Sequence, residues 1–94
     1  MFELMYQLHY TNRFKKDVKR AVKRGYDMSL LEKAIDLLQE TGKLPPEYKT
    51  HILSGNYAGK HECHIKPDWL LIWEQDDKAL TLLFLNTGTH SDLF

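Results

Sequence analysis

The sequence has little that would tie the chain to a membrane, a disulfide or a nucleotide-binding loop. One of its 94 residues is cysteine, Cys63, so no disulfide can form within the chain, which fits a reducing compartment. The longest apolar run, residues 69–73, is far shorter than the roughly 20 residues that span a bilayer. The N-terminus lacks the basic segment and apolar run of a secretion signal. Gly55 and Gly59 do not have the spacing of a phosphate-binding loop. We therefore expect a soluble, cytoplasmic protein without a membrane partner.

Net charge is also absent, because 13 Lys and Arg balance 13 Asp and Glu. The distribution is uneven, since residues 1–49 hold ten cations and seven acids, whereas residues 50–94 hold three cations and six acids. A basic helix face can bind RNA or an acidic partner, and it is also an ordinary solvated surface. The cations of this face are Arg13, Lys15, Lys16, Lys19, Arg20, Lys23 and Arg24.

The first half of the chain has the periodicity of one strand and two helices. Residues 4–10 predict the strand, and Thr11 or Asn12 can cap the helix that follows, which Gly25 can end. A second helix begins at Ser29, in a capping box with Glu32, and ends at Gly42. The apolar stripes of the two helices are Phe14, Val18, Ala21 and Val22 in the first, and Leu31, Ala34, Ile35 and Leu38 in the second.

The second half predicts three strands, over residues 60–66, 69–74 and 79–87, with a short tail after Gly88. No repeat or linker divides the chain, so we expect one domain over residues 1–94. The order strand, helix, helix, strand, strand, strand predicts an α+β fold in which two helices pack on one face of a mostly antiparallel sheet. Such an architecture does not by itself indicate a chemistry.

Five histidines are many for a chain of this length, and three lie in polar or strand-end positions: His51, His64 and His90. Metal-independent RNA cleavage needs a base for the ribose 2′-hydroxyl, an acid for the leaving 5′-oxygen, and a cation for the crowded phosphate. Histidine suits both proton transfers because it ionises near neutral pH. Nearby lysines can stabilise the charge, and the candidates are Lys49, Lys60 and Lys66.

Each histidine also has a purely structural interpretation. His51 can cap a loop, His64 can pair with Glu62 on the same strand face, and His90 can cap the C-terminal turn. Histidine count alone therefore leaves both interpretations open.

The neighbouring residues have the same double interpretation. Asp68 follows a proline, as turn residues do. Trp69 and Trp73 share a strand face and fit a core, although an exposed tryptophan can stack on a base. Phe94 can dock the tail or stack on a base.

Metal and thiol chemistry have less support in the sequence. His61 and Cys63 point to one face of their predicted strand and His64 to the other, and no paired CxxC or HxxxH spacing exists. Cys63 lies beside Ile65 on an apolar face, as a small core residue does. We expect neither a metal nor another cofactor.

Three motifs stand out when the histidines are read with their neighbours. They are His51-x-Leu53-x-Gly55, the run Glu-Cys-His-Ile-Lys-Pro-Asp-Trp at residues 62–69, and Thr-Gly-Thr-His-Ser-Asp-Leu-Phe at residues 87–94. Together they resemble the YafQ family of RelE-type toxins, and the resemblance covers essentially the whole chain. It implies a microbial-RNase-like α+β fold and ribosome-dependent cleavage of mRNA in the A site. It also implies a cognate antitoxin of ribbon-helix-helix type, and operator DNA bound only through the toxin–antitoxin complex.

The resemblance also implies the residues of the site. The family's functional histidines match His51, His64 and His90, its aspartate matches Asp68, and its tryptophan and terminal phenylalanine match Trp69 and Phe94. We expect His90 and either His64 or Asp68 to divide the acid and base roles. The role expected for His51 is to hold the phosphate.

Two departures from the family pattern lower the number of cations. His61 and Asn86 stand where family members often have arginine, which leaves fewer donors for a phosphate intermediate. The alternative function is therefore a catalytically weak or inactive RelE-fold protein that serves as antitoxin partner and transcriptional co-repressor. A nuclease of naked RNA is less favoured, because a neutral chain lacks long-range attraction for it.

Overall fold

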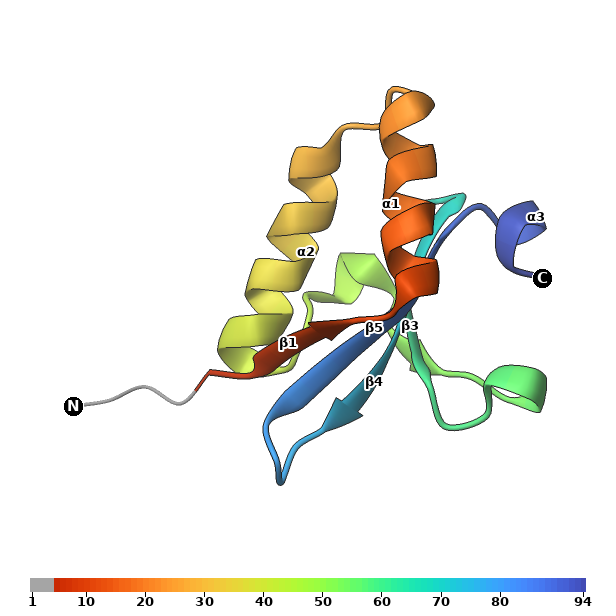
Figure 1. The fold of residues 1–94 in the computed structure, drawn as a ribbon. Helices are drawn as coiled ribbons and strands as arrows, with labels where there is room; N and C mark the ends of the chain where they lie inside the picture. The colour runs from red at the N-terminus through yellow and green to blue at the C-terminus, as the bar shows by residue number, and fades with distance from the viewer. Residues whose placement is uncertain (1–4) are drawn as a thin grey trace.

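The computed structural model describes residues 5–94, and within them two long helices cover one face of a five-stranded sheet (Figure 1). The helices are α1 (Asn12–Lys23), α2 (Met28–Thr41) and the short α3 (His90–Leu93). The strands are β1 (Gln7–Tyr10), β2 (His51–Ile52), β3 (His61–Lys66), β4 (Trp69–Asp76) and β5 (Thr81–Gly88). Two single 3-10 turns, η1 (Pro46–Tyr48) and η2 (Gly55–Tyr57), flank β2.

The strand order is β1-β5-β4-β3-β2, in which β1 runs parallel to β5 and all other pairs are antiparallel. This confirms the predicted α+β fold with a mostly antiparallel sheet. The first strand begins at Gln7, and the start predicted at residue 4 lies outside the described residues. In residues 5–94, no helix has the length and apolar character that crossing a membrane requires.

Helix α1 begins as predicted, because the Thr11 hydroxyl accepts the backbone N–H of Phe14 at 3.0 Å. Its predicted stripe is wrong at Val22, whose exposed fraction is 56%, whereas Asp17 on the same helix is only 1% exposed. The backbone N–H of Thr87 donates to Asp17 at 3.1 Å, so a polar partner on β5 decides which side of α1 faces inward.

Helix α2 is capped by Asp27, and the predicted capping box of Ser29 with Glu32 is wrong. The Asp27 carboxylate accepts the backbone N–H of Ser29 at 3.1 Å and its hydroxyl at 2.6 Å, and these hydrogen bonds lower the pKa of Asp27. Gly42 ends the helix as predicted, with a left-handed φ of 71° that suits glycine.

The main core lies between the helices and the sheet. Its buried members are Phe14, Leu31, Ala34, Leu38, Cys63, Trp69, Leu71, Trp73, Leu82 and Phe84. On the opposite face Leu70 and Ile72 of β4 pack with Leu93 of α3 in a smaller cluster. Alternate residues of β4 thus pack in two different cores. Because both faces of this strand are buried, its sequence is a continuous apolar run.

Two elements were predicted as loop or tail. Strand β2 pairs its two residues with β3, so that His51 lies opposite Glu62. Helix α3 is capped by Thr89, whose hydroxyl accepts the N–H of Asp92 while the Asp92 carboxylate accepts the N–H of Thr89. Both elements are too short to show a hydrophobic period, and both contribute a histidine to the site described next.

Candidate active site

Three histidine rings form a row at one end of the sheet. The centroids of His51 and His64 are 6.3 Å apart, and those of His64 and His90 are 5.9 Å apart. Antiparallel pairing brings them together, because β2 lies beside β3 and Gly88 of β5 lies opposite Leu70 of β4. The structure therefore places side by side three residues that the sequence separates by as many as 39 positions.

A buried carboxylate lies beneath two of these rings. Glu62 is 4% exposed, and its Oε1 is 3.1 Å from Nε2 of His51 and 3.9 Å from Nε2 of His64. The predicted pairing of His64 with Glu62 is thus secondary to the contact with His51. Glu62 is not among the residues that the sequence predicts for the site, although Glu62 and His64 are two residues apart and therefore lie on the same face of β3.

The remaining ring nitrogens of His51 and His64 face backbone carbonyls. Nδ1 of His51 is 3.1 Å from the carbonyl oxygen of Lys49, and Nδ1 of His64 is 3.2 Å from that of Pro67. A carbonyl oxygen only accepts hydrogen bonds, so each Nδ1 carries a proton. Nε2 of His64, its other nitrogen, lies 3.9 Å from Glu62 and is left for proton transfer.

His90 is held by Asp68. One oxygen of Asp68, Oδ1, accepts the backbone N–H of His90 at 2.9 Å and lies 2.6 Å from Nδ1 of the ring. These two hydrogen bonds, the backbone one first, lower the pKa of Asp68. Asp68 therefore acts on His90 as an ionised hydrogen-bond acceptor, which leaves Nε2 of His90 available. Thr89, and not His90, caps the C-terminal turn.

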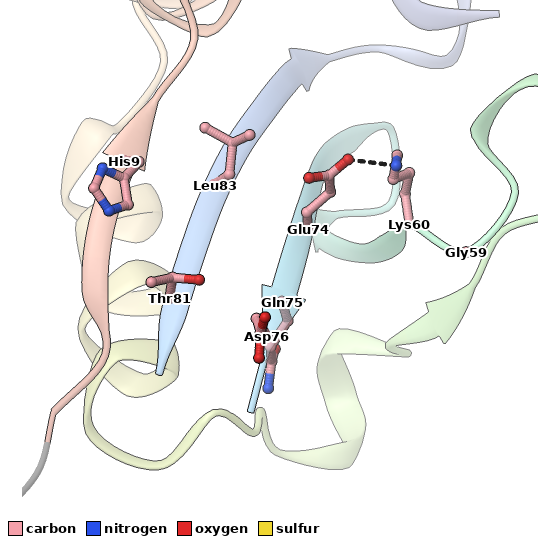
Figure 2. Close-up of a pocket in the computed structure, with 8 residues that line it drawn as sticks. All are labelled: His9, Gly59, Lys60, Glu74, Gln75, Asp76, Thr81 and Leu83. Carbon is pink, nitrogen blue, oxygen red and sulfur yellow. Dashed lines mark ion pairs between the residues drawn. The ribbon is translucent and has the colours of Figure 1, made fainter. Parts of the chain in front are cut away.

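The structure separates the three candidate lysines. Lys49 and Lys66 border one hollow together with His64. Lys60 lies at the other end of β3, where it forms an ion pair with Glu74 on the wall of a different hollow (Figure 2). Lys60 lies four residues before His64, which is about 13 Å along an extended strand.

The aromatic candidates have different exposures. Trp69 is 3% exposed, its Nε1–H donates to Oγ1 of Thr87 at 2.9 Å, and its ring packs against Tyr26. It supports the site from within and offers no face to a base. Phe94 is 64% exposed and meets the edge of Tyr57 at a centroid distance of 5.5 Å, so its ring is accessible.

Three of the seven cations of α1 and its C-cap are engaged with carboxylates. Arg13 and Arg20 pair with Asp17, and Arg24 pairs with Asp92. Four exposed lysines form no ion pair within residues 5–94: Lys15, Lys16, Lys19 and Lys23. The surface available for phosphate is therefore a lysine row.

Asn86 and His61, which stand where family members often have arginine, lie in different surroundings. Asn86 is buried, with Nδ2 at 3.4 Å from the Asp17 carboxylate, and His61 stacks on Trp73 at 5.4 Å. Burial lowers the pKa of His61. Cations at the row of rings must therefore come from Lys49, Lys66 or the histidines.

Metal and thiol chemistry gain no support from the described residues. In residues 5–94 no three His, Cys, Asp or Glu side chains gather as metal ligands. Cys63 is fully buried, and burial followed by the nearby Glu62 charge raises the pKa of its thiol to about 12. This agrees with the interpretation of Cys63 as a core residue.

Comparison with known proteins gives a consistent result. The model of the family described as "Bacterial toxin of type II toxin-antitoxin system, YafQ" matches residues 6–94. The mRNA interferase toxin YafQ of Escherichia coli K12 is 43% identical over 88 residues, covering 93% of this chain and 94% of that protein.

Two solved structures are also similar to this chain. The E. coli DinJ-YafQ toxin-antitoxin complex aligns with TM-score 0.86 and 40% identity, covering 95% of this chain and 97% of the other. A metal-bound toxin from Helicobacter pylori aligns with TM-score 0.87 and 39% identity, covering 96% and 100%.

Proposed function

The chain belongs to the YafQ family of bacterial toxins of type II toxin–antitoxin systems, and from this premise we propose that it is an mRNA interferase. The proposed reaction is endonucleolytic cleavage of mRNA in the ribosomal A site, by attack of a ribose 2′-hydroxyl on the adjacent phosphate. The observation that supports it most is the row of three histidine rings with two carboxylates, Glu62 and Asp68, against them.

His90 is the first of the proposed acid–base pair. Because Asp68 accepts from Nδ1, the ring is held in one orientation with Nε2 directed away from the carboxylate. An ionised Asp68 also stabilises the imidazolium that forms when Nε2 takes a proton. Such a pair is suited to proton transfer at one of the two reacting oxygens.

His64 is the second member. Its Nδ1 donates to the carbonyl of Pro67, so Nε2 takes part in the chemistry from a neighbouring position in the row. Ring centroids 5.9 Å apart bring both rings within reach of one bound phosphate group, whose attacking and leaving oxygens would each meet one ring. Which ring is the acid follows from the orientation of the RNA.

His51 fits a phosphate-binding role. Its Nδ1 faces a carbonyl and its Nε2 faces the Glu62 carboxylate, so both nitrogens have an acceptor when the ring is an imidazolium. A fixed cation beside the phosphate stabilises the charge that develops in the transition state. Lys49 and Lys66, which border the hollow at His64, add to this positive charge.

The charge distribution supports the proposed dependence on the ribosome. The chain has no net charge, so it lacks long-range attraction for naked RNA, yet α1 presents four exposed lysines that form no ion pair with any residue the structure describes. A lysine row of this kind binds backbone phosphates irrespective of sequence. We therefore place ribosomal RNA on α1 and mRNA at the histidines.

A cognate antitoxin completes the proposal. The similar E. coli protein forms a complex with DinJ. For this chain we expect an antitoxin of ribbon-helix-helix type, with operator DNA bound only by the complex. The alternative, a RelE-fold partner without catalysis, predicts the same complex and no cleavage, so activity decides between them.

The decisive experiment maps mRNA 5′ ends on programmed ribosomes. Wild-type protein should cut within the A-site codon and leave naked RNA intact, and His90→Ala should lower the rate about 10²–10⁴-fold, the usual loss when a general acid or base is removed. His9→Ala is the matched control, because His9 is an exposed histidine on β1, outside the row. A folded His90→Ala protein with full activity contradicts the assignment, and an inactive wild-type protein supports the alternative.

Two further measurements test the finer claims. Exchange of Lys15, Lys16 and Lys19 for glutamine should weaken ribosome binding and flatten its dependence on salt, because fewer counterions are released. Activity that persists after a chelator selective for transition metals has been added supports the metal-independent route. Loss of activity that zinc or copper restores would contradict it.

A further inference from the structure

Helix α3 has four residues, too few to be stable by its own hydrogen bonds. Yet it begins with His90, whose ring must keep a defined position if it transfers protons. Two contacts account for part of its attachment, since Leu93 enters the smaller core and the N–H of His90 donates to Asp68.

A third contact comes from Asp92 on the opposite side of the helix. The guanidinium of Arg24, at the C-cap of α1, donates from Nη1 to Oδ2 of Asp92 at 2.6 Å and from Nη2 to Oδ1 at 3.1 Å. Such a two-point contact fixes direction as well as distance. Asp92 also caps α3 through the N–H of Thr89, so the ion pair and the helix start share one carboxylate.

Arg20 connects this pair to the core. One of its nitrogens, Nη2, lies 3.7 Å from Asp92, 3.2 Å from the buried Asp17, and donates to the carbonyl of Thr87 at 3.1 Å. Gly88 makes this approach possible, because a Cβ there would lie 2.7 Å from Arg20 Nη2 and 2.8 Å from Asp92 Oδ2. The end of α1 is therefore linked to α3 through a continuous set of charged contacts.

We propose that Arg24 and Asp92 are positioning residues for cleavage, which hold α3 at two points so that His90 keeps its hydrogen bond to Asp68 and its place beside His64. The inference rests on the proposed role of His90 in the reaction. It also assigns Arg24 a role different from that of the neighbouring lysines on α1, which are exposed and pair with no carboxylate in residues 5–94. Arg24 acts through α3, and the lysines act on ribosomal RNA.

The first test uses the free protein, so it does not depend on nuclease activity. In the wild type, the hydrogen bond to Asp68 fixes one tautomer, and 15N NMR should give well-separated shifts for Nδ1 and Nε2 of His90. In Arg24→Gln the two shifts should move toward each other, because the released ring exchanges between tautomers. Arg24→Lys, which keeps one charged donor, should restore part of the separation. Lys23→Gln removes the same charge next door and should leave the His90 shifts unchanged.

The second test separates turnover from ribosome binding. At saturating ribosome concentration, Arg24→Gln and Asp92→Asn should each lower the maximal cleavage rate about threefold to tenfold, with partial rescue by Arg24→Lys, while the charge-matched Lys78→Gln in the β4–β5 turn keeps the wild-type rate. Unchanged His90 shifts in Arg24→Gln would overturn the proposal. So would altered shifts with an unchanged maximal rate, or a rate deficit that disappears at saturation. If wild-type protein cleaves nothing, the proposed function fails while the NMR comparison still decides whether Arg24 holds His90.

Discussion

Replacing Asp17 by alanine should destabilise the protein more than replacing any exposed carboxylate. Asp17 is 1% exposed, accepts the N–H of Thr87 at 3.1 Å, and pairs with Arg13 at 3.0 Å and Arg20 at 3.2 Å. Removing one member of a buried ion pair costs about 3–5 kcal/mol, because the other charges lose their partner. Both arginines keep access to water, with side-chain exposures of 55% and 31%, so we expect the lower end, about 3 kcal/mol.

Urea unfolding followed by circular dichroism measures this loss. For a chain whose whole stability is roughly 5–15 kcal/mol, a loss of about 3 kcal/mol is large. With a urea slope of about 1.5 kcal/mol/M it lowers the midpoint by about 2 M. Asp17→Asn, which keeps an acceptor for Thr87, should lie between the wild type and Asp17→Ala. Asp36→Ala, at an exposed position of α2, should cost less than about 0.5 kcal/mol. A loss below about 1 kcal/mol for Asp17→Ala would refute the view that this carboxylate joins α1 to β5.

Three other predictions concern single groups. Cys63 should resist alkylation by iodoacetamide in the folded state, and rapid alkylation of native protein at pH 8 would contradict this. Because the pKa of its thiol is raised to about 12, the stability that Cys63 contributes should be complete below about pH 8.5 and decline at higher pH. Since the pKa of Asp68 is lowered, its contribution to docking α3 should be complete above about pH 4 and fall as the pH drops through its folded value. The 13C signal of the carboxyl group and the His90 amide signal should change together in acid, and a carboxyl group that takes up its proton while the His90 amide signal stays unchanged would contradict it. Gly88→Ala should lower the free energy of unfolding by about 1–3 kcal/mol, measured by thermal unfolding, because the added methyl group forces the side chains of Arg20 and Asp92 apart. A variant as stable as the wild type would show that these side chains move aside without cost.

Elements with a long hydrophobic period were predicted well. Both long helices and the three strands of the second half are present, since periodic burial is written into their residues. The errors fall at places where a distant partner decides the outcome. Val22 and Asp17 compete to face the core, and the N–H of Thr87 on β5 selects the carboxylate. Asp27 was passed over for Ser29 because both are good caps and only backbone geometry distinguishes them.

The site shows the same division. Histidine content and motif spacing indicated His51, His64 and His90, and the structure gathers them into one row. Glu62 was left as a possible partner of His64, because its importance depends on the register of β2 against β3. Lys60 is a candidate because it is near the histidines in sequence, and the structure shows its ammonium group in an ion pair with Glu74 of β4.

The amino-acid sequence alone thus determined the fold class, the family resemblance and the residues suited to acid–base chemistry, because periodicity, side-chain type and motif spacing are local properties. Only the tertiary structure decided which of these residues meet, which nitrogen of each ring is engaged, and that Arg24 and Asp92 hold the end of the chain against α1. Hydrogen bonds and ion pairs depend on distances of a few ångströms between residues far apart in the sequence, such as Asp17 and Thr87, which are 70 positions apart. Such distances are products of strand register and helix packing, which no local pattern contains.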